Sequence, residues 1–176
     1  MIRQNLLFPL LLLTTLSVSS LAMGQSVPDR DFSLDEEPFP KLSKMSWLDE
    51  RFLHNHRQLV SDLSYAHYRR KLEDFKDVQA LLQEIIDDKL IEQDDMQSWQ
   101  ALGVVLGDQF ILANHRLKWT MYEDELGESH AICVGASKHC IFPVSTLARR
   151  AKIGIKPDIA KVYKKVMDEM APYLGK

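Results

Sequence analysis

The sequence predicts an α+β domain in which helices pack on a small three-stranded antiparallel sheet, a meander. Apolar residues recur at helical spacing between about residues 46 and 114, and the spacing changes to alternation between about residues 117 and 142. Helical spacing then returns after about residue 143. Helices and strands therefore follow one another in blocks, which is typical of α+β proteins and not of alternating α/β proteins.

The first two helices are predicted from capping and periodicity. Ser46 is followed three residues later by Asp49, which is the pattern of a capping box, and we expect a helix from there to about Leu72. From Val78 to Leu90 the apolar residues recur every three or four positions, and the opposite face is polar. Both segments indicate helices with one packed side and one solvated side.

A third helix is expected from Asp94, with Gln97 as its capping partner, to about Asn114. It is apolar on most sides, so we expect it to lie at the centre of the domain. Gly103 and Gly107 lie inside it, although a glycine costs a helix interior about 1 kcal/mol relative to alanine. We therefore expect a helix or strand to cross close to its backbone at these glycines.

Three strands are expected next, at residues 117–122, 130–134 and 139–142. The acidic stretch 123–128 is expected to be the first turn and residues 135–138 the second. A helix layer should cover one face, because small sheets alone are marginally stable.

Two helices should complete the domain. We expect the first at residues 144–153. Pro157 fits the first position of the last helix, and Pro172 is expected to stop it.

The N-terminal residues 1–24 predict a secretory signal peptide. Arg3 precedes an apolar run, and Ala22-Met23-Gly24 has the small residues of a cleavage site. The run is shorter than the roughly 18–20 residues of a membrane-spanning helix, so we expect cleavage and no stable membrane anchor. We expect residues 25–43 to form a flexible acidic leader and residues 44–176 a single domain, located in the periplasm.

Charge and histidine spacing argue against two classes of partner. The formal net charge is −3 and the basic residues are dispersed, so we expect no nucleic acid to bind. His54 and His56 would point about 200° apart on a helix, and His130 and His139 would lie about 13 Å apart on a hairpin. We expect no metal site and no cofactor.

The only two cysteines, Cys133 and Cys140, are expected to form a disulfide. If residues 135–138 form the turn, Cys133 lies directly opposite Cys140. Directly opposed residues place their Cβ atoms about 4.5–5.5 Å apart, close enough to relax into a disulfide. An exported chain also meets the oxidising conditions that a disulfide requires.

Asp108 is the carboxylate of greatest interest, because it follows Gly107 in the apolar third helix and should be partly buried. A buried carboxylate needs a partner, and we expect Arg149 or Arg150 to supply it in a structural ion pair. The alternative is a ligand-binding or catalytic carboxylate. Glu123 and Asp124 are expected to lie in a solvated turn, with a binding role as the alternative.

Residues 100–154 also resemble a known family in the order of their motifs. Residues 102–108 read L-G-V-V-L-G-D, Trp119 lies in a predicted strand, residues 123–127 read E-D-E-L-G and residues 142–150 read F-P-V-S-T-L-A-R-R. This order resembles a bacterial domain of unknown function that is frequent in short chains of Gram-negative bacteria. The resemblance implies an α+β domain and no activity. The first two helices lie outside the matched segment, and we count Trp119 with the candidate binding or structural residues.

The sequence contains no G-x-S-x-G nucleophile motif and no phosphate-binding glycine loop. We therefore expect a non-enzymatic periplasmic domain that binds another envelope protein or a peptide, in an immunity-type or envelope-accessory role. The alternative is an envelope hydrolase or a small-ligand-binding protein that uses Asp108 and the acidic turn.

Overall fold

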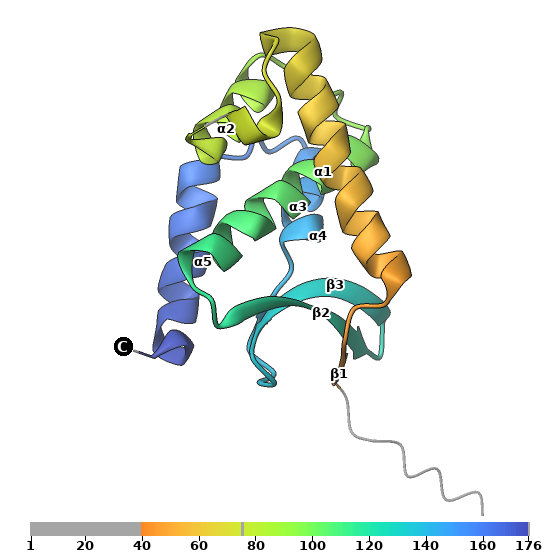
Figure 1. Ribbon diagram of the computed structural model, residues 1–176, viewed down its shortest axis with the longest axis vertical. Helices are drawn as coiled ribbons and strands as arrows, with labels where there is room; N and C mark the ends of the chain where they lie inside the picture. The colour runs from red at the N-terminus through yellow and green to blue at the C-terminus, as the bar shows by residue number, and fades with distance from the viewer. Residues whose placement is uncertain (1–39, 75, 176) are drawn as a thin grey trace, which may run out of the picture. The chain divides into compact units, whose positions relative to one another are not determined.

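The computed structural model describes residues 40–74 and 76–175, and Figure 1 shows the arrangement of their elements. Within these ranges the elements are β1 (Lys41–Ser43), α1 (Trp47–Tyr68), a 3₁₀ helix (Leu72–Asp74), α2 (Val78–Asp87), α3 (Met96–Ala113), β2 (Leu117–Asp124), β3 (Gly127–Val134), β4 (Cys140–Ile141), α4 (Pro143–Lys152) and α5 (Ile159–Leu174). The α+β class is confirmed, with four strands in place of three. The predicted signal peptide, residues 1–24, and residues 25–39 of the predicted leader lie outside the described residues.

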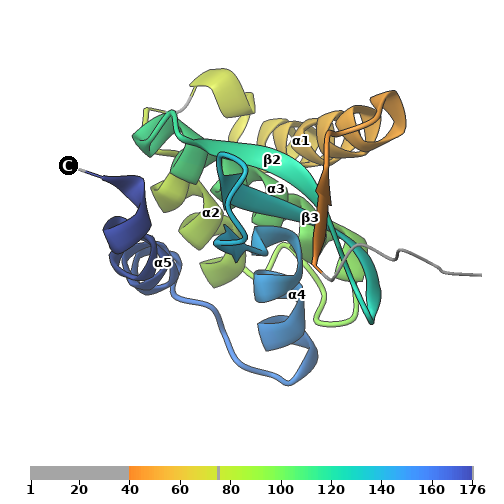
Figure 2. The ribbon, with the colours of Figure 1, turned by 90° about the horizontal axis from the view of Figure 1, so that it is seen from below.

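The sheet is antiparallel in the order β1-β2-β3-β4, and its inner face packs on α3. Trp119 and Ile132 are directly opposite each other on β2 and β3, and both side chains reach α3 at Gly107. Figures 1 and 2 show the helices on one side of the sheet, and no described helix covers the other side. None of the helices in the described ranges combines the length and the apolar character needed to cross a lipid bilayer.

Strand β1 corrects the prediction for the end of the leader. Residues 41–43 were expected to be flexible, but they pair with β2 as an antiparallel edge strand. Three residues are too few to produce a detectable alternation in the sequence. The position of Lys41 explains the pairing in part. On β2, Glu123 has Glu128 of β3 directly opposite on one side and Lys41 of β1 directly opposite on the other. A cation beside two opposed carboxylates relieves their repulsion.

The first hairpin is also tighter than expected, since β2 and β3 continue through most of the predicted turn 123–128. Asp124 pairs with Gly127, so only Glu125 and Leu126 make the turn. The Asp124 carboxylate accepts a hydrogen bond from the Leu126 N–H at 2.8 Å, and Gly127 has a φ of 119°. A side-chain bond to the backbone and a glycine at positive φ together close a two-residue connection.

The second hairpin has the register that the cysteines predict. Cys133 is directly opposite Cys140, and the two sulfur atoms are bonded at 2.04 Å. The predicted disulfide is therefore confirmed. Cys133 is fully buried, so the bond is a structural link between β3 and β4.

Helix α1 begins as predicted and ends earlier. The hydroxyl of Ser46 accepts the Asp49 N–H and the Asp49 carboxylate accepts the Ser46 N–H, which confirms the capping box. The helix ends at Tyr68, short of Leu72, because two buried serines on α1 bind the chain that follows. The hydroxyl of Ser64 donates to the carbonyl of Arg70, and that of Ser61 accepts the Leu72 N–H.

Helix α3 is largely buried and has the predicted close crossings at both glycines. A Cβ on Gly103 would collide with the carbonyl oxygen of Pro143 and lie 2.8 Å from the Cα of Val144, at the start of α4. A Cβ on Gly107 would lie 2.5 Å from the Trp119 ring. The helix starts one residue later than predicted, because Asp95 and not Asp94 accepts the capping N–H.

The last two helices differ from prediction at their ends. Helix α4 covers residues 143–152, and α5 is capped by Asp158, with Pro157 just outside it. Pro172 lies inside the last turn of α5 and does not stop it. That turn is held from outside, since Arg116 donates to the carbonyl of Leu174 at 2.6 Å and the ring of His139 stacks on Tyr173.

We predict different costs for alanine at the two glycines. Gly103→Ala should lower the free energy of unfolding by about 3 kcal/mol, because the new methyl meets backbone, and overpacking of this kind costs about 1–3 kcal/mol. Gly107→Ala should cost about 1–2 kcal/mol, since the Trp119 side chain can move. Urea unfolding measures both, with the exposed Gln97→Ala as the control on the same helix. Equal stability of all variants would contradict the close crossings.

We predict that the intact mass of the protein purified without a reductant is two hydrogens below that of the reduced chain. Reduction should lower the free energy of unfolding by about 2–3 kcal/mol, because the disulfide closes a short loop. Urea unfolding with and without a reductant measures this, and Cys133→Ala/Cys140→Ala should not respond to the reductant. Two free thiols in the unreduced protein would contradict the assignment.

Candidate functional site

The Asp108 carboxylate joins three elements of the fold. Its Oδ2 accepts a hydrogen bond from Arg57 Nε at 2.6 Å, and its Oδ1 accepts one from Arg57 Nη2 at 2.7 Å. The Trp119 indole N–H also donates to Oδ1, at 3.0 Å. The side chains of Arg57 and Asp108 are 37% and 25% exposed. The carboxylate therefore links α3 to α1 by a bidentate ion pair and to β2 by a neutral donor.

The sequence around Asp108 explains this arrangement. Gly107 has no side chain, so the Trp119 ring can lie against α3 with its N–H beside the next residue. Arg57 reaches the same carboxylate from α1, which packs along α3. The hydrogen bonds that Arg57 donates to Asp108 raise the pKa of Arg57, although partial burial acts in the opposite direction. Arg57 is therefore a permanent cation in this pair.

The prediction that Arg149 or Arg150 forms an ion pair with Asp108 is wrong. Arg149 is exposed and donates to the hydroxyl of Ser145 on its own helix, at 2.8 Å. Helix α4 meets α3 at Gly103, one turn before Asp108, and no ion pair joins Asp108 to Arg149 or Arg150 in the described residues. Sequence reasoning missed Arg57 because it lies on the exposed-looking face of α1, 51 positions from Asp108.

The structure brings Asp108 and Trp119 together and leaves the other candidates apart. Glu123 lies four residues beyond Trp119 on β2, about 13 Å at 3.3 Å per residue. Asp124 accepts the Leu126 N–H in the hairpin turn. Asp108 and the acidic turn therefore do not form a joint catalytic or binding constellation.

A cleft of about 430 Å³ opens beside the ion pair, between α1, α3 and the 3₁₀ helix. Arg57 and Asp108 lie on one wall, and Val105 and Leu112 on α3 supply apolar surface. Lys71 and Glu73 also line the cleft. The cleft is large enough for a small ligand.

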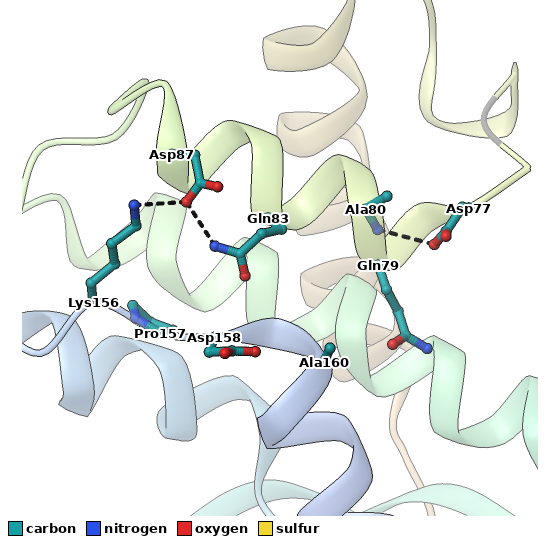
Figure 3. A pocket seen from close by; sticks show the side chains of 9 residues that line it. All are labelled: Asp77, Gln79, Ala80, Gln83, Asp87, Lys156, Pro157, Asp158 and Ala160. Carbon is teal, nitrogen blue, oxygen red and sulfur yellow. Dashed lines mark hydrogen bonds and ion pairs between the residues drawn. The ribbon is translucent and has the colours of Figure 1, made fainter.

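A second hollow, of about 670 Å³, lies between α2 and the start of α5 (Figure 3). Its polar groups hold the two segments together. Lys156 is 2.8 Å from the Asp87 carboxylate, which also accepts the Gln83 amide N–H at 2.8 Å. Gln83 in turn accepts the backbone N–H of Ile159 at the start of α5, at 2.9 Å. This hollow therefore positions the chain between α4 and α5.

A third hollow, of about 400 Å³, has a mixed lining, in which Lys89, Glu92, Gln93 and Lys156 are the polar residues. Ile86, Ile91, Trp99 and Ala151 form buried parts of its wall. Beside it, Ile153 and Ile155 in the α4–α5 loop are 70% and 48% exposed. Sequence reasoning placed Ile153 at the end of a helix and missed this patch. The signal was available, since two isoleucines separated by a glycine lie in a loop where polar residues are usual.

The histidines occupy separate surroundings. His54 is exposed at the cleft, whereas His56 is a buried residue of the same helix, so the two rings lie on different faces as predicted. His130 binds Asp49, and His139 stacks on Tyr173. Across residues 40–74 and 76–175, no group of three or more His, Cys, Asp or Glu side chains is placed to hold a metal ion.

We predict that Asp108→Asn lowers the free energy of unfolding by about 1–2 kcal/mol. Hydrogen bonds to charged groups contribute about 1.5–3 kcal/mol, and the partial exposure of this pair reduces that value. A double-mutant cycle with Arg57→Gln should give a coupling of about 1 kcal/mol. The cycle of Asp108→Asn with Arg149→Gln should give no coupling energy. Coupling to Arg149 and none to Arg57 would restore Arg149 as the partner.

Comparison with known proteins supports the fold. No curated protein sequence matches the chain. A crystal structure of a protein from Bacteroides thetaiotaomicron VPI-5482 superposes with a TM-score of 0.67 and 16% sequence identity. The match covers 76% of this chain and 49% of that one, so this chain spans about half the length of that protein. At this identity the likeness shows the fold alone.

The sequence of residues 77–163 matches the family described as a domain of unknown function, DUF3806. This range contains the segment 100–154 that carries the resemblance noted in the sequence. It includes α2, which was expected to lie outside, and it leaves α1 outside. Residues 77–163, slightly less than half of the chain, are therefore similar to the DUF3806 family.

Proposed function

We propose that this chain is an exported, non-enzymatic domain that binds an apolar segment of another envelope protein or of a peptide. The observation that carries the proposal is the exposed pair Ile153 and Ile155 beside a hollow that has buried apolar residues in its wall. Single exposed apolar side chains are ordinary on protein surfaces, whereas a pair of them beside a partly apolar hollow favours an interaction site. Burial of such a side chain contributes about 1.5–3 kcal/mol.

The loop that carries these isoleucines is held in place before any partner binds. The N–H of Gly154 donates to the carbonyl of Ala151, and that of Ile155 to the carbonyl of Arg150, both at 2.9 Å. The Lys156–Asp87 ion pair fixes the next residue (Figure 3). A surface ordered in advance loses less conformational entropy on binding, which favours a docking role.

Two observations support a periplasmic location. Residues 1–24 have the features of a signal peptide. The Cys133–Cys140 bond is of the kind that persists in oxidising compartments. An immunity-type or envelope-accessory role fits a small domain of this kind, since both roles act by binding a protein.

The test is affinity capture from periplasmic extract with the wild-type chain and with Ile153→Asp/Ile155→Asp. We expect the wild type to retain a partner and the double variant to lose it at least about tenfold, because one lost apolar anchor alone exceeds 1.4 kcal/mol. Leu126→Asp is the matched control, since Leu126 is 97% exposed at the distant hairpin turn. No partner on the wild type, or equal capture by the double variant, would contradict the proposal.

A small-ligand site is the second candidate, and the cleft beside Arg57 and Asp108 favours it. The variant Asp108→Asn separates the two functions when it is studied both by capture and by thermal unfolding. It should leave capture through Ile153 and Ile155 unchanged, whereas it should abolish any ligand-dependent rise in melting temperature if the cleft is the site.

A further inference from the structure

The guanidinium of Arg57 has a second edge that the fold does not use. Asp108 accepts from Nε and Nη2, which form one edge of the planar group. A guanidinium has five N–H groups, so three remain, and one on Nη1 and one on Nη2 point in parallel from the other edge. These three have no acceptor among the described residues, and the Arg57 side chain is 37% exposed. A second carboxylate can therefore bind this edge through two parallel hydrogen bonds.

A second spare donor lies one turn further along α1. Ser61 is 8% exposed and lines the same cleft as Arg57. Its hydroxyl accepts the Leu72 N–H at 3.2 Å, but its own proton has no acceptor in the described part of the chain. Positions 57 and 61 are four residues apart, so the two side chains lie on one face of the helix. A buried donor without an acceptor is costly, and an oxygen atom of a bound ligand would supply that acceptor.

The other two charged side chains of the cleft, Lys71 and Glu73, have opposite signs. Both are exposed, and neither side chain has a hydrogen bond or an ion pair with another described residue. The pair of Arg57 and Asp108 is neutral as a whole, so the long-range field of the cleft is close to balanced. The short-range contacts then decide which ligand fits, and the groups left without a partner by Arg57 and Ser61 are all donors.

The cleft also has an apolar wall. Leu72 and Val78 are half-buried, and Leu112 on α3 is 79% exposed. The cleft volume of about 430 Å³ lies within the range of about 300–1,000 Å³ that is usual for small-molecule sites. Such sites combine apolar side chains with a few polar groups that orient the ligand. The lining therefore fits a ligand with one acceptor head group and a small apolar body.

We propose that this cleft binds an organic carboxylate with a small apolar body. The carboxylate lies between the free edge of Arg57 and the hydroxyl of Ser61, and the body lies against Leu72 and Leu112. Asp108 is a positioning residue, because it holds the guanidinium by the opposite edge. The inference rests on the second candidate function and names the ligand class of its site. Free organic acids and the C-terminal residue of a peptide share this chemistry.

Titration of the protein with four probes, followed in ¹H–¹⁵N spectra, tests the ligand class. 4-Phenylbutyrate represents a free acid and acetyl-leucine a peptide C-terminus, and the primary amide of each is the matched neutral control. We expect the acids to shift the backbone signals of residues 57–61, 71–73 and 108–112. They should bind at least about tenfold more tightly than the amides, because an amide cannot accept from both donors of the fork. Binding of one acid alone supports the proposal and identifies the source of the carboxylate.

The contrary outcomes are distinct. Equal binding of acids and amides in the cleft would overturn the carboxylate class, while the cleft would remain a ligand site. No shifts with any probe at millimolar concentration, or shifts only elsewhere, would overturn both this inference and the second candidate function. Capture through Ile153 and Ile155 is a separate measurement and is unaffected by either result.

Two exposed charges should act with opposite signs. Lys71→Gln should weaken binding of the acids about twofold to fivefold, and Glu73→Gln should strengthen it by a similar factor, as is usual for exposed charge pairs. Binding of the amides should not change. Lys76→Gln is the matched control, because Lys76 is exposed in the same connection but does not line the cleft. Effects of the same sign, or equal effects of Lys71→Gln and Lys76→Gln, would overturn the proposal.

Arg57→Lys tests the fork and keeps the positive charge. A lysine has no parallel pair of N–H groups, so affinity for the acids should fall at least about tenfold. Unchanged affinity in a folded Arg57→Lys variant would overturn the proposal. If this variant does not fold, the exposed Lys71 and Glu73 variants decide the question.

Discussion

The close crossing of the sheet over Gly107 is the constraint on which the rest of the domain depends. Because this position has no side chain, Trp119 and Ile132 can lie directly against α3. Their contact sets the distance between the helix and the sheet, and it brings the indole N–H to Asp108. Asp108 then orients Arg57 and with it the middle of α1. One missing methyl group therefore determines how three elements meet.

Features that depend on neighbours in sequence were predictable. The capping box at Ser46, the amphipathic pattern of α2 and the register of the cysteine hairpin are all encoded within a few residues. The position of α3 at the centre also followed from its composition. The capping residue of α3 was misplaced by one position because Asp94 and Asp95 are adjacent and chemically equivalent, so that only the backbone geometry separates them.

Features that depend on distant contacts were not predictable. The sequence identifies Asp108 as a carboxylate in need of a partner, but Arg149, Arg150 and Arg57 are equally good donors by residue type. Only the α1–α3 packing selects Arg57. Strand β1 is defined by its pairing with β2 and not by its own pattern. Pro172 was expected to end α5, but its helical turn is stabilised by Arg116 and His139 from outside the helix.

Helix α1 has an unusual place in the order of assembly. Its capping box is complete within four residues, so its first turn can form as soon as this stretch of chain exists. Its tertiary partners come much later in the chain, Asp108 after 51 positions and His130 after 81. Contacts of such long sequence separation form slowly, because a long loop must close first. Helix α1 is thus among the first segments able to adopt its local structure and among the last to find its packing surface.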